Sequence, residues 1–119
     1  MERALVVGSS GGIGSALVSA LAARGVEVTE LSRCIDGMDV SNARSVERAF
    51  AKLQEPFDLI IIATGILSSE GATPEKSLSA IDASDMMHLF AVNAVGPALI
   101  LKEVPRLLPR SGRSVIAVL

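Results

Sequence analysis

The feature that most constrains the fold is a glycine-rich stretch, residues 8–14, which reads Gly-Ser-Ser-Gly-Gly-Ile-Gly between a short apolar run and an alanine-rich helical pattern. Glycine lacks a Cβ atom, so the backbone of such a turn can approach a ligand closely. The free N–H groups at the start of the helix then point towards an anion. An ordinary tight turn needs one glycine. Three at positions 8, 12 and 14, with Ser9 and Ser10 as hydroxyl donors, favour phosphate binding.

Composition limits the class of protein. The chain has 119 residues, of which 50% are hydrophobic, enough for one domain with a single core. Its net charge of −2 leaves no basic stripe for nucleic acid. The longest apolar run, Leu59–Leu67, is shorter than the roughly 20 residues of a bilayer span, and the lone Cys34 cannot form an internal disulfide. We therefore expect a cytoplasmic protein that binds neither nucleic acid nor membrane, and no cluster predicts a metal site.

Hydrophobic periodicity predicts strands alternating with helices. Strands are expected at 4–7, 26–31, 58–63 and 114–119, with a weaker one at 35–39. Helices are expected at 12–24, from a Ser41 cap to Glu55-Pro56, and from about 85 to 108 after a cap at Asp82 or Ser84. Residues 66–80 predict a loop, with one helical turn starting at Thr73-Pro74.

This pattern predicts one α/β domain, a Rossmann-type doubly wound parallel sheet with strand order 3-2-1-4-5, truncated after the fifth strand. Ligands of such sheets bind beyond the carboxyl ends of the strands. Five segments fall on that edge: Gly8, Ser32-Arg33, Asp39, Ala63-Thr64-Gly65 and Leu119.

Four motifs in order carry a resemblance to a known family. Residues 8–14 are similar to TGxxxGxG, with Val7 in place of Thr, and Asp39-Val40 lies where an adenine-contacting Asp occurs. Residues 62–65, Ile-Ala-Thr-Gly, stand in place of N-N-A-G, and residues 92–96 carry N-x-x-G. The chain thus resembles the N-terminal half of the short-chain dehydrogenase/reductase family, and within it the smaller C-factor-type members.

The resemblance implies a site for a nicotinamide dinucleotide. The residues assigned to it are Gly8, Ser9, Ser10, Gly12, Ile13, Gly14, Ser32, Arg33, Asp39, Val40, Ala63, Thr64 and Gly65. Arg33 is either a solvated cation at a strand end or, with Ser32, a ligand for the 2′-phosphate of NADP. No acid occupies the position that would hold the ribose hydroxyl of NAD, although Glu30 is near, so NADP(H) is favoured over NAD(H).

Other site residues have alternative interpretations. Asp39 is expected to satisfy its own loop or cap the next helix, and the resemblance implies the compatible role of accepting a hydrogen bond from the adenine amino group. Ile13 is expected to donate its backbone N–H while its side chain packs inward. Thr64 is expected to carry a buried, backbone-bonded hydroxyl, and His88 to be a packed or surface histidine rather than a catalytic one.

Asn93 lies four residues before Pro97, which has no N–H to donate to the Asn93 carbonyl. That carbonyl is therefore free of its α-helical bond. One interpretation is a kink that curves the helix around the sheet. The other, implied by the resemblance, is that the carbonyl holds a water in a proton relay to a catalytic lysine.

The resemblance implies an NADP-dependent oxidoreductase acting on a small carbonyl or alcohol substrate, as a homodimer or homotetramer joined through the long helix. The chain contains no tyrosine, and ends near the place of the family's catalytic serine, before any Y-x-x-x-K pair. We therefore expect the intact protein to be an enzyme and these 119 residues alone to be inactive. The alternative is a non-catalytic dinucleotide-binding signalling or sensing module.

Overall fold

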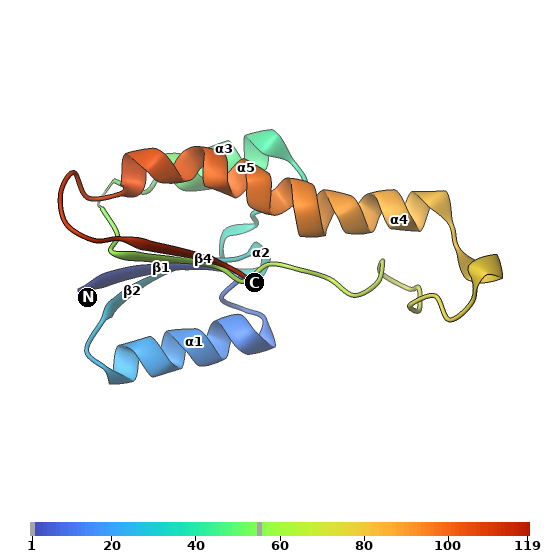
Figure 1. Ribbon diagram of the computed structural model, residues 1–119, viewed down its shortest axis with the longest axis horizontal. Helices are drawn as coiled ribbons and strands as arrows, with labels where there is room; N and C mark the ends of the chain where they lie inside the picture. Colours follow the sequence, from blue (N-terminus) through green and yellow to red (C-terminus); the bar gives the residue numbers. More distant parts are fainter. Residues whose placement is uncertain (1, 55) are drawn as a thin grey trace.

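A parallel sheet lies between helices in the computed structural model, which describes residues 2–54 and 56–119 (Figure 1). Its strands are β1 (Arg3–Val7), β2 (Glu27–Leu31), β3 (Leu59–Ile62) and β4 (Val115–Val118), in the order β2-β1-β3-β4. Val7 pairs with Leu31 on one side and Ile62 on the other, and Ile62 pairs with Val118. The carboxyl ends of all four strands therefore meet at one edge.

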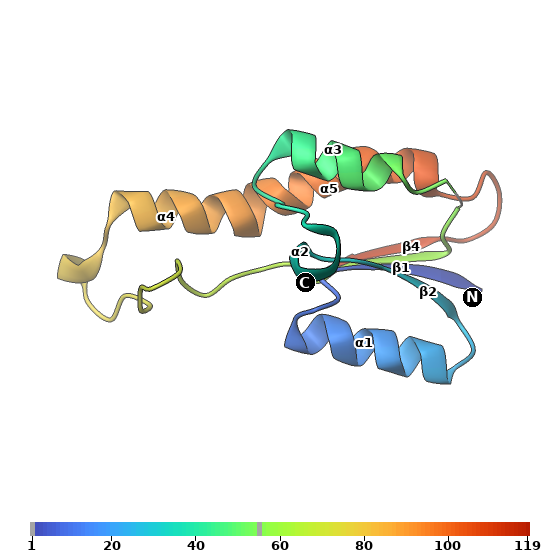
Figure 2. The ribbon, with the colours of Figure 1, turned by 180° about the vertical axis from the view of Figure 1, so that it is seen from behind.

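Helices cover the two faces unequally (Figure 2). One face carries α1 (Gly12–Ala23) alone, and the other carries α3 (Ala43–Ala51) and α5 (Gly96–Glu103). Along the chain, α2 (Arg33–Asp36) lies between β2 and α3, and the 3₁₀ turn η1 (Leu78–Ala80) lies between β3 and the next helix. The helical segment from α4 (Ala83–Phe90) continues through the π-helical η2 (Ala91–Val95) and α5 into the 3₁₀ turn η3 (Val104–Leu107).

The main core lies under α3 and α5. Side chains alternate across the sheet, so Leu5, Val7, Ile60 and Ile62 point to that side. They pack against buried residues of the covering helices, among them Val46, Phe50, Ile100, Val104 and Leu107. Each such large side chain contributes about 1.5–3 kcal/mol on burial. The opposite face is thinner: Ala4, Leu59 and Ile61 pack mainly with Leu17 and Leu21 of α1. The packing on both faces fixes β1 and β3 in the middle of the sheet.

The segment Ala83–Leu107 is long and apolar enough, by length and composition only, to cross a membrane. The C-terminal half of this segment packs inside the protein, because Ile100, Val104 and Leu107 are buried in the core against the sheet. Its N-terminal half, α4, extends beyond the sheet together with the 66–82 loop (Figures 1 and 2). The packing is that of a helix covering a sheet.

The strand predicted at 35–39 is wrong. Its residues form α2 and the following loop instead, because the Ser32 hydroxyl accepts from the Ile35 N–H at 3.0 Å and starts a helix. Gly37, with φ +68°, then ends that helix in a left-handed conformation. The parallel α/β sheet is confirmed with four strands. The predicted five-strand order 3-2-1-4-5 therefore lacks its third strand. The other four predicted strands, in the order 2-1-4-5, correspond to β2-β1-β3-β4.

Smaller differences concern the helices. Asn42, rather than Ser41, caps α3 by accepting from the Ser45 N–H at 3.0 Å. The helix stops at Ala51, and the predicted terminator Glu55 lies outside the described residues. The helical turn in the 66–80 loop occurs at 78–80 instead of at Thr73-Pro74. The cap of α4 at Asp82 and the loop at residues 66–80 are as predicted.

Candidate functional site: a cavity at the carboxyl edge of the sheet

The glycine turn joins three elements. Gly8 has φ +87°, and a Cβ there would lie 2.7 Å from the Ala63 carbonyl oxygen. A Cβ on Gly14 would lie only 2.0 Å from the Gly8 carbonyl oxygen, so the start of α1 packs directly on the turn. A Cβ on Gly12 would meet no atom within 4 Å. Gly8 and Gly14 are thus required by the fold, whereas Gly12 leaves open space in front of the helix.

The N-terminus of α1 offers its amides to a ligand. Its N-cap, Gly11, has no side chain to satisfy the first N–H groups, and no acidic residue lies in the first turn. Such an end attracts anions. The side chain of Ile13 is 66% exposed, so the prediction that it packs inward is wrong. It points away from the core because Gly14, not Ile13, occupies the contact with the turn.

Two buried hydroxyls lie beside this turn. Ser9 is 2% exposed, and in the described part of the chain neither its Oγ nor Thr64 Oγ1 has a hydrogen-bond partner. The expected backbone bond of Thr64 is therefore absent. Unpartnered buried polar atoms are unusual and costly in a folded protein. They leave donors at the ends of β1 and β3.

Ser32 and Arg33 lie at the end of β2. The Ser32 N–H donates to Asp36 Oδ2 at 2.9 Å while its hydroxyl accepts from Ile35. The hydroxyl proton of Ser32 remains for a further acceptor. Arg33 starts α2 and lines the cavity described below. Asp36, which was not among the predicted site residues, folds back onto Ser32.

Asp39 shapes the next loop. Its Oδ1 accepts from the Ser41 hydroxyl at 2.6 Å and from the Ser41 N–H at 3.0 Å, while its own N–H donates to Ser45 Oγ at 2.9 Å. The hydrogen bond from the Ser41 hydroxyl is the main cause that holds the pKa of Asp39 below its usual value, and the electrostatic influence of Arg33 and His88 acts in the same direction. The carboxylate therefore satisfies its loop, as one interpretation predicted, and Asn42 takes the capping role.

These segments enclose a cavity of about 440 Å³. It brings together nine of the predicted cofactor residues: Gly8, Ser10, Ser32, Arg33, Asp39, Val40, Ala63, Thr64 and Gly65. Ser9, Gly12, Ile13, Gly14 and Asn93 do not line it. Seven lining residues were not predicted: Gly11, Gly37, Met38, Ser41, Ile66, His88 and Val92. His88 reaches this wall because α4 passes over the 39–41 loop, which no local pattern reveals.

Asn93 fastens the long helix to the end of β3. Its Oδ1 accepts from the Ile66 N–H at 2.8 Å, and its Nδ2 donates to the Ile66 carbonyl at 2.7 Å. Three residues later, a Cβ on Gly96 would lie 3.0 Å from Val40 Cγ2, so this glycine lets the helix approach the 39–41 loop. Both residues of the N-x-x-G motif therefore position neighbouring segments of the cavity.

The helix changes type around Asn93. Residues 91–95 are π-helical, and the Gly96 N–H donates to the Ala91 carbonyl five residues back. Pro97 follows and lacks the N–H that would bond Asn93 in an α-helix. The predicted interruption is thus present as a π-bulge, a feature frequent at functional sites.

Comparison with known proteins agrees with this architecture. The family profile of the NAD dependent epimerase/dehydratase family matches residues 4–99. A small-chain dehydrogenase in complex with NADPH superposes with a TM-score of 0.78 at 24% identity, over 98% of this chain and 49% of that one. A carbonyl reductase from Pseudomonas aeruginosa gives 0.76 at 23%, over 100% and 60%.

A third structure, ligand-free aldohexose dehydrogenase from Thermoplasma acidophilum, gives a TM-score of 0.79 at 21% identity, over 98% of this chain and 48% of that one. The chain thus spans about half to three-fifths of the length of these structures. Among curated proteins, no sequence match was found. The fold is shared with these dehydrogenase and reductase structures, and the chain belongs to the NAD dependent epimerase/dehydratase family.

Proposed function

We propose that this chain is the cofactor-binding half of an NADP-dependent short-chain oxidoreductase of the C-factor type. The observation that carries the proposal is the cavity that joins the glycine turn, Arg33, Asp39 and Gly65 at one edge of the sheet. The clefts of such sheets bind dinucleotides at this edge.

The residues present fit a nicotinamide dinucleotide. Gly8 and Gly14 bring the turn and α1 too close together for any Cβ, which leaves the amides at the start of α1 for the pyrophosphate. Thr64, whose hydroxyl has no hydrogen-bond partner among the described residues, lies on the wall of the same cavity. Asp39 and Val40 would hold the adenine, and Gly65 would allow the ribose to approach β3. A small-chain dehydrogenase of similar fold binds NADPH, which supports the choice of ligand.

Arg33 is the basis for preferring NADP(H). A guanidinium offers a planar fork of donors for a phosphate, and Ser32 retains one hydroxyl proton beside it. Asp36, the acid that lies nearby, accepts from the Ser32 N–H. It is thereby held in a structural bond, and Arg33 is left to meet the 2′-phosphate.

The bound cofactor would supply hydride to a carbonyl carbon, or take it from an alcohol carbon. The chain's own contribution is to bind and orient the cofactor. The Asn93 carbonyl, within the π-helical segment, would hold a water in a proton relay to a catalytic lysine, as the family resemblance implies. The sequence contains no tyrosine, the residue that the family resemblance assigns as general acid and base. We expect these 119 residues to bind NADPH without turning over a carbonyl.

A non-catalytic dinucleotide-binding signalling or sensing module is the second candidate, favoured by the same lack of tyrosine. Both candidates place the protein in the cytoplasm. We also infer a homodimer or homotetramer joined through the long helix, where Met87 is 72% exposed and Leu101 is 39% exposed. Sedimentation velocity of the chain and of Met87→Glu would test this, with dissociation of the variant as the expected result.

The test of cofactor choice is calorimetric titration with NADPH and NADH. Arg33→Ala should weaken NADPH binding about 10- to 100-fold, the loss of one charge-assisted contact, and leave NADH binding unchanged. Arg44→Ala is the matched control, because Arg44 is an exposed arginine of α3 away from the cavity. Equal losses for both cofactors, or for both variants, would contradict the proposed 2′-phosphate contact.

A further inference from the structure

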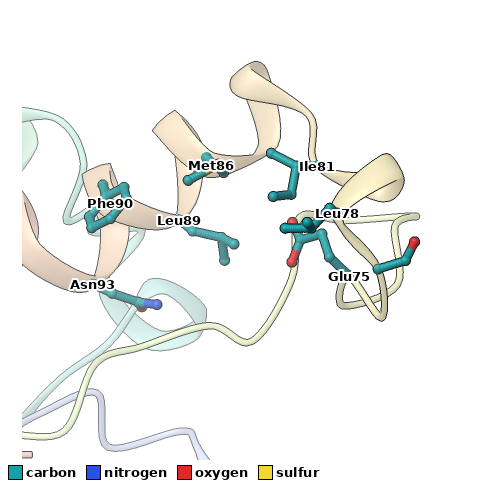
Figure 3. A pocket seen from close by; sticks show the side chains of 8 residues that line it. Glu75, Leu78, Ile81, Met86, Leu89, Phe90 and Asn93 are labelled. Carbon is teal, nitrogen blue, oxygen red and sulfur yellow. The ribbon is translucent and has the colours of Figure 1, made fainter.

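A second hollow, of about 680 Å³, lies between α4 and the segment around η1 (Figure 3). Its lining residues are Glu75, Ser77, Leu78, Ile81, Met86, Leu89, Phe90 and Asn93. In Figure 3, Leu78 and Ile81 point towards Leu89 across the opening. The volume is in the range of roughly 300–1,000 Å³ that is typical of small-molecule sites.

The walls of this hollow are apolar and uncovered. Leu78 is 88% exposed, Phe90 61% and Ile81 51%. Large side chains gathered around one concave surface in this way mark a binding site rather than scattered surface residues. A ligand that covers them gains the free energy of removing their apolar area from water.

The hollow adjoins the proposed dinucleotide cavity. Asn93 lines the hollow, Ile66 lines the cavity, and the two residues are joined by the pair of hydrogen bonds at 2.8 and 2.7 Å. One wall therefore separates the two spaces at the end of β3. A ligand in the hollow would lie next to a dinucleotide whose ribose approaches Gly65.

The polar groups of the hollow define the chemistry of its ligand. Glu75 is the one charged residue among those that line it, and Figure 3 shows its carboxylate near Leu78. Asn93 and Ser77 are the neutral polar groups. An anionic ligand would meet a like charge and, among the described residues that line the hollow, no cation, whereas a neutral ligand would meet apolar walls.

We propose that this hollow binds the apolar part of a neutral carbonyl or alcohol substrate and disfavours carboxylate-bearing analogues. The proposal rests on the proposed function and adds the substrate class. It assigns Leu78, Ile81, Met86 and Leu89 to substrate binding and Glu75 to charge selection.

The methionines allow a direct test by NMR of the chain with ¹³C-labelled methionine methyl groups. Met86 lines the hollow, Met38 lines the dinucleotide cavity, and Met87 is exposed outside both. Benzophenone serves as a neutral aryl ketone, and 4-benzoylbenzoate as the same ketone with a carboxylate. Benzophenone should shift the Met86 methyl signal while Met38 and Met87 stay in place. The carboxylate should bind about fivefold more weakly, as expected for a nearby like charge in water.

Two variants and one control distinguish the effect of the Glu75 charge on binding from the effect of the apolar walls. Glu75→Gln should remove the difference between the two ketones, and Glu70→Gln, an exposed acid on the same loop outside the hollow, should preserve it. Leu78→Gln should weaken the binding of both ketones. Because Leu78 is highly exposed, this substitution should not unfold the chain.

Three results would overturn the proposal. They are benzophenone shifts at Met38 or Met87 without Met86, equal affinity for the two ketones, and concentration-dependent broadening of Met86 without ligand, which would mean that a second copy fills the hollow. NADPH should shift Met38 in the same spectra. Loss of that response alone would count against the proposed function, and loss of the Met86 response alone against the substrate site.

Discussion

The carboxamide of Asn93 makes two hydrogen bonds with the backbone of Ile66, one donated at 2.7 Å and one accepted at 2.8 Å, across 27 residues of sequence. A Cβ on Gly65 would lie 3.4 Å from the same Asn93 Oδ1. The long helix and the end of β3 are therefore held in one fixed relation. The proposed dinucleotide cavity and the apolar hollow lie on either side of this connection.

Asn93→Ala should loosen the 66–82 loop. Both hydrogen bonds are lost, which should lower the free energy of unfolding by about 1–3 kcal/mol. Hydrogen–deuterium exchange should speed up at Ile66 and along the loop, and NADPH binding should weaken. Lys102→Ala, an exposed change on the same helical segment, is the control and should leave exchange unaltered. Unchanged protection at Ile66 in Asn93→Ala would mean that the connection is not needed.

Gly12→Ala and Gly14→Ala should fail in different ways. An alanine at 14 collides with the Gly8 carbonyl, so unfolding should become easier by about 1–3 kcal/mol. An alanine at 12 meets no atom, so stability should be kept while NADPH binding falls roughly tenfold, because the methyl group occupies the phosphate approach. Thermal melts and calorimetry distinguish the two. Full NADPH affinity in Gly12→Ala would remove the pyrophosphate from this turn.

Ser41→Ala should raise the pKa of Asp39 towards its ordinary value of 3.8, because the hydroxyl bond is the largest cause that lowers it. A group with a lowered folded pKa stabilises the protein above its unfolded pKa, and that contribution is lost as pH falls through the folded value. The order of the 39–41 turn should thus disappear in acid, and at higher pH in the variant. ¹³C carboxyl titration measures this, with Asp58 as the internal reference. An unmoved Asp39 titration would contradict the assignment.

Local patterns predicted the elements with strong local causes. The glycine turn, the buried strands at 4–7 and 58–63 and the cap at Asp82 each depend on residues that are neighbours in sequence. The strand expected at 35–39 did not form, because Ser32 and Gly37 set the ends of a short helix that outweighs the apolar residues between them.

Local sequence patterns could not predict contacts between segments that are distant along the chain. Pro97 predicted an interruption at Asn93, but nothing in the sequence indicates that its side chain meets Ile66. His88 lines the proposed dinucleotide cavity because α4 lies beside the 39–41 loop. The apolar hollow likewise needs the 75–81 segment to lie opposite α4, a distance across the fold that periodicity does not encode.

The central claim is that the carboxyl edge of this sheet binds a nicotinamide dinucleotide. Titration of the ¹⁵N-labelled chain with NADPH tests it most directly. The largest amide shifts are expected at Gly11 to Gly14, at Arg33 and at Gly65. Absence of saturable shifts, or shifts confined to η1 and α4, would contradict the account.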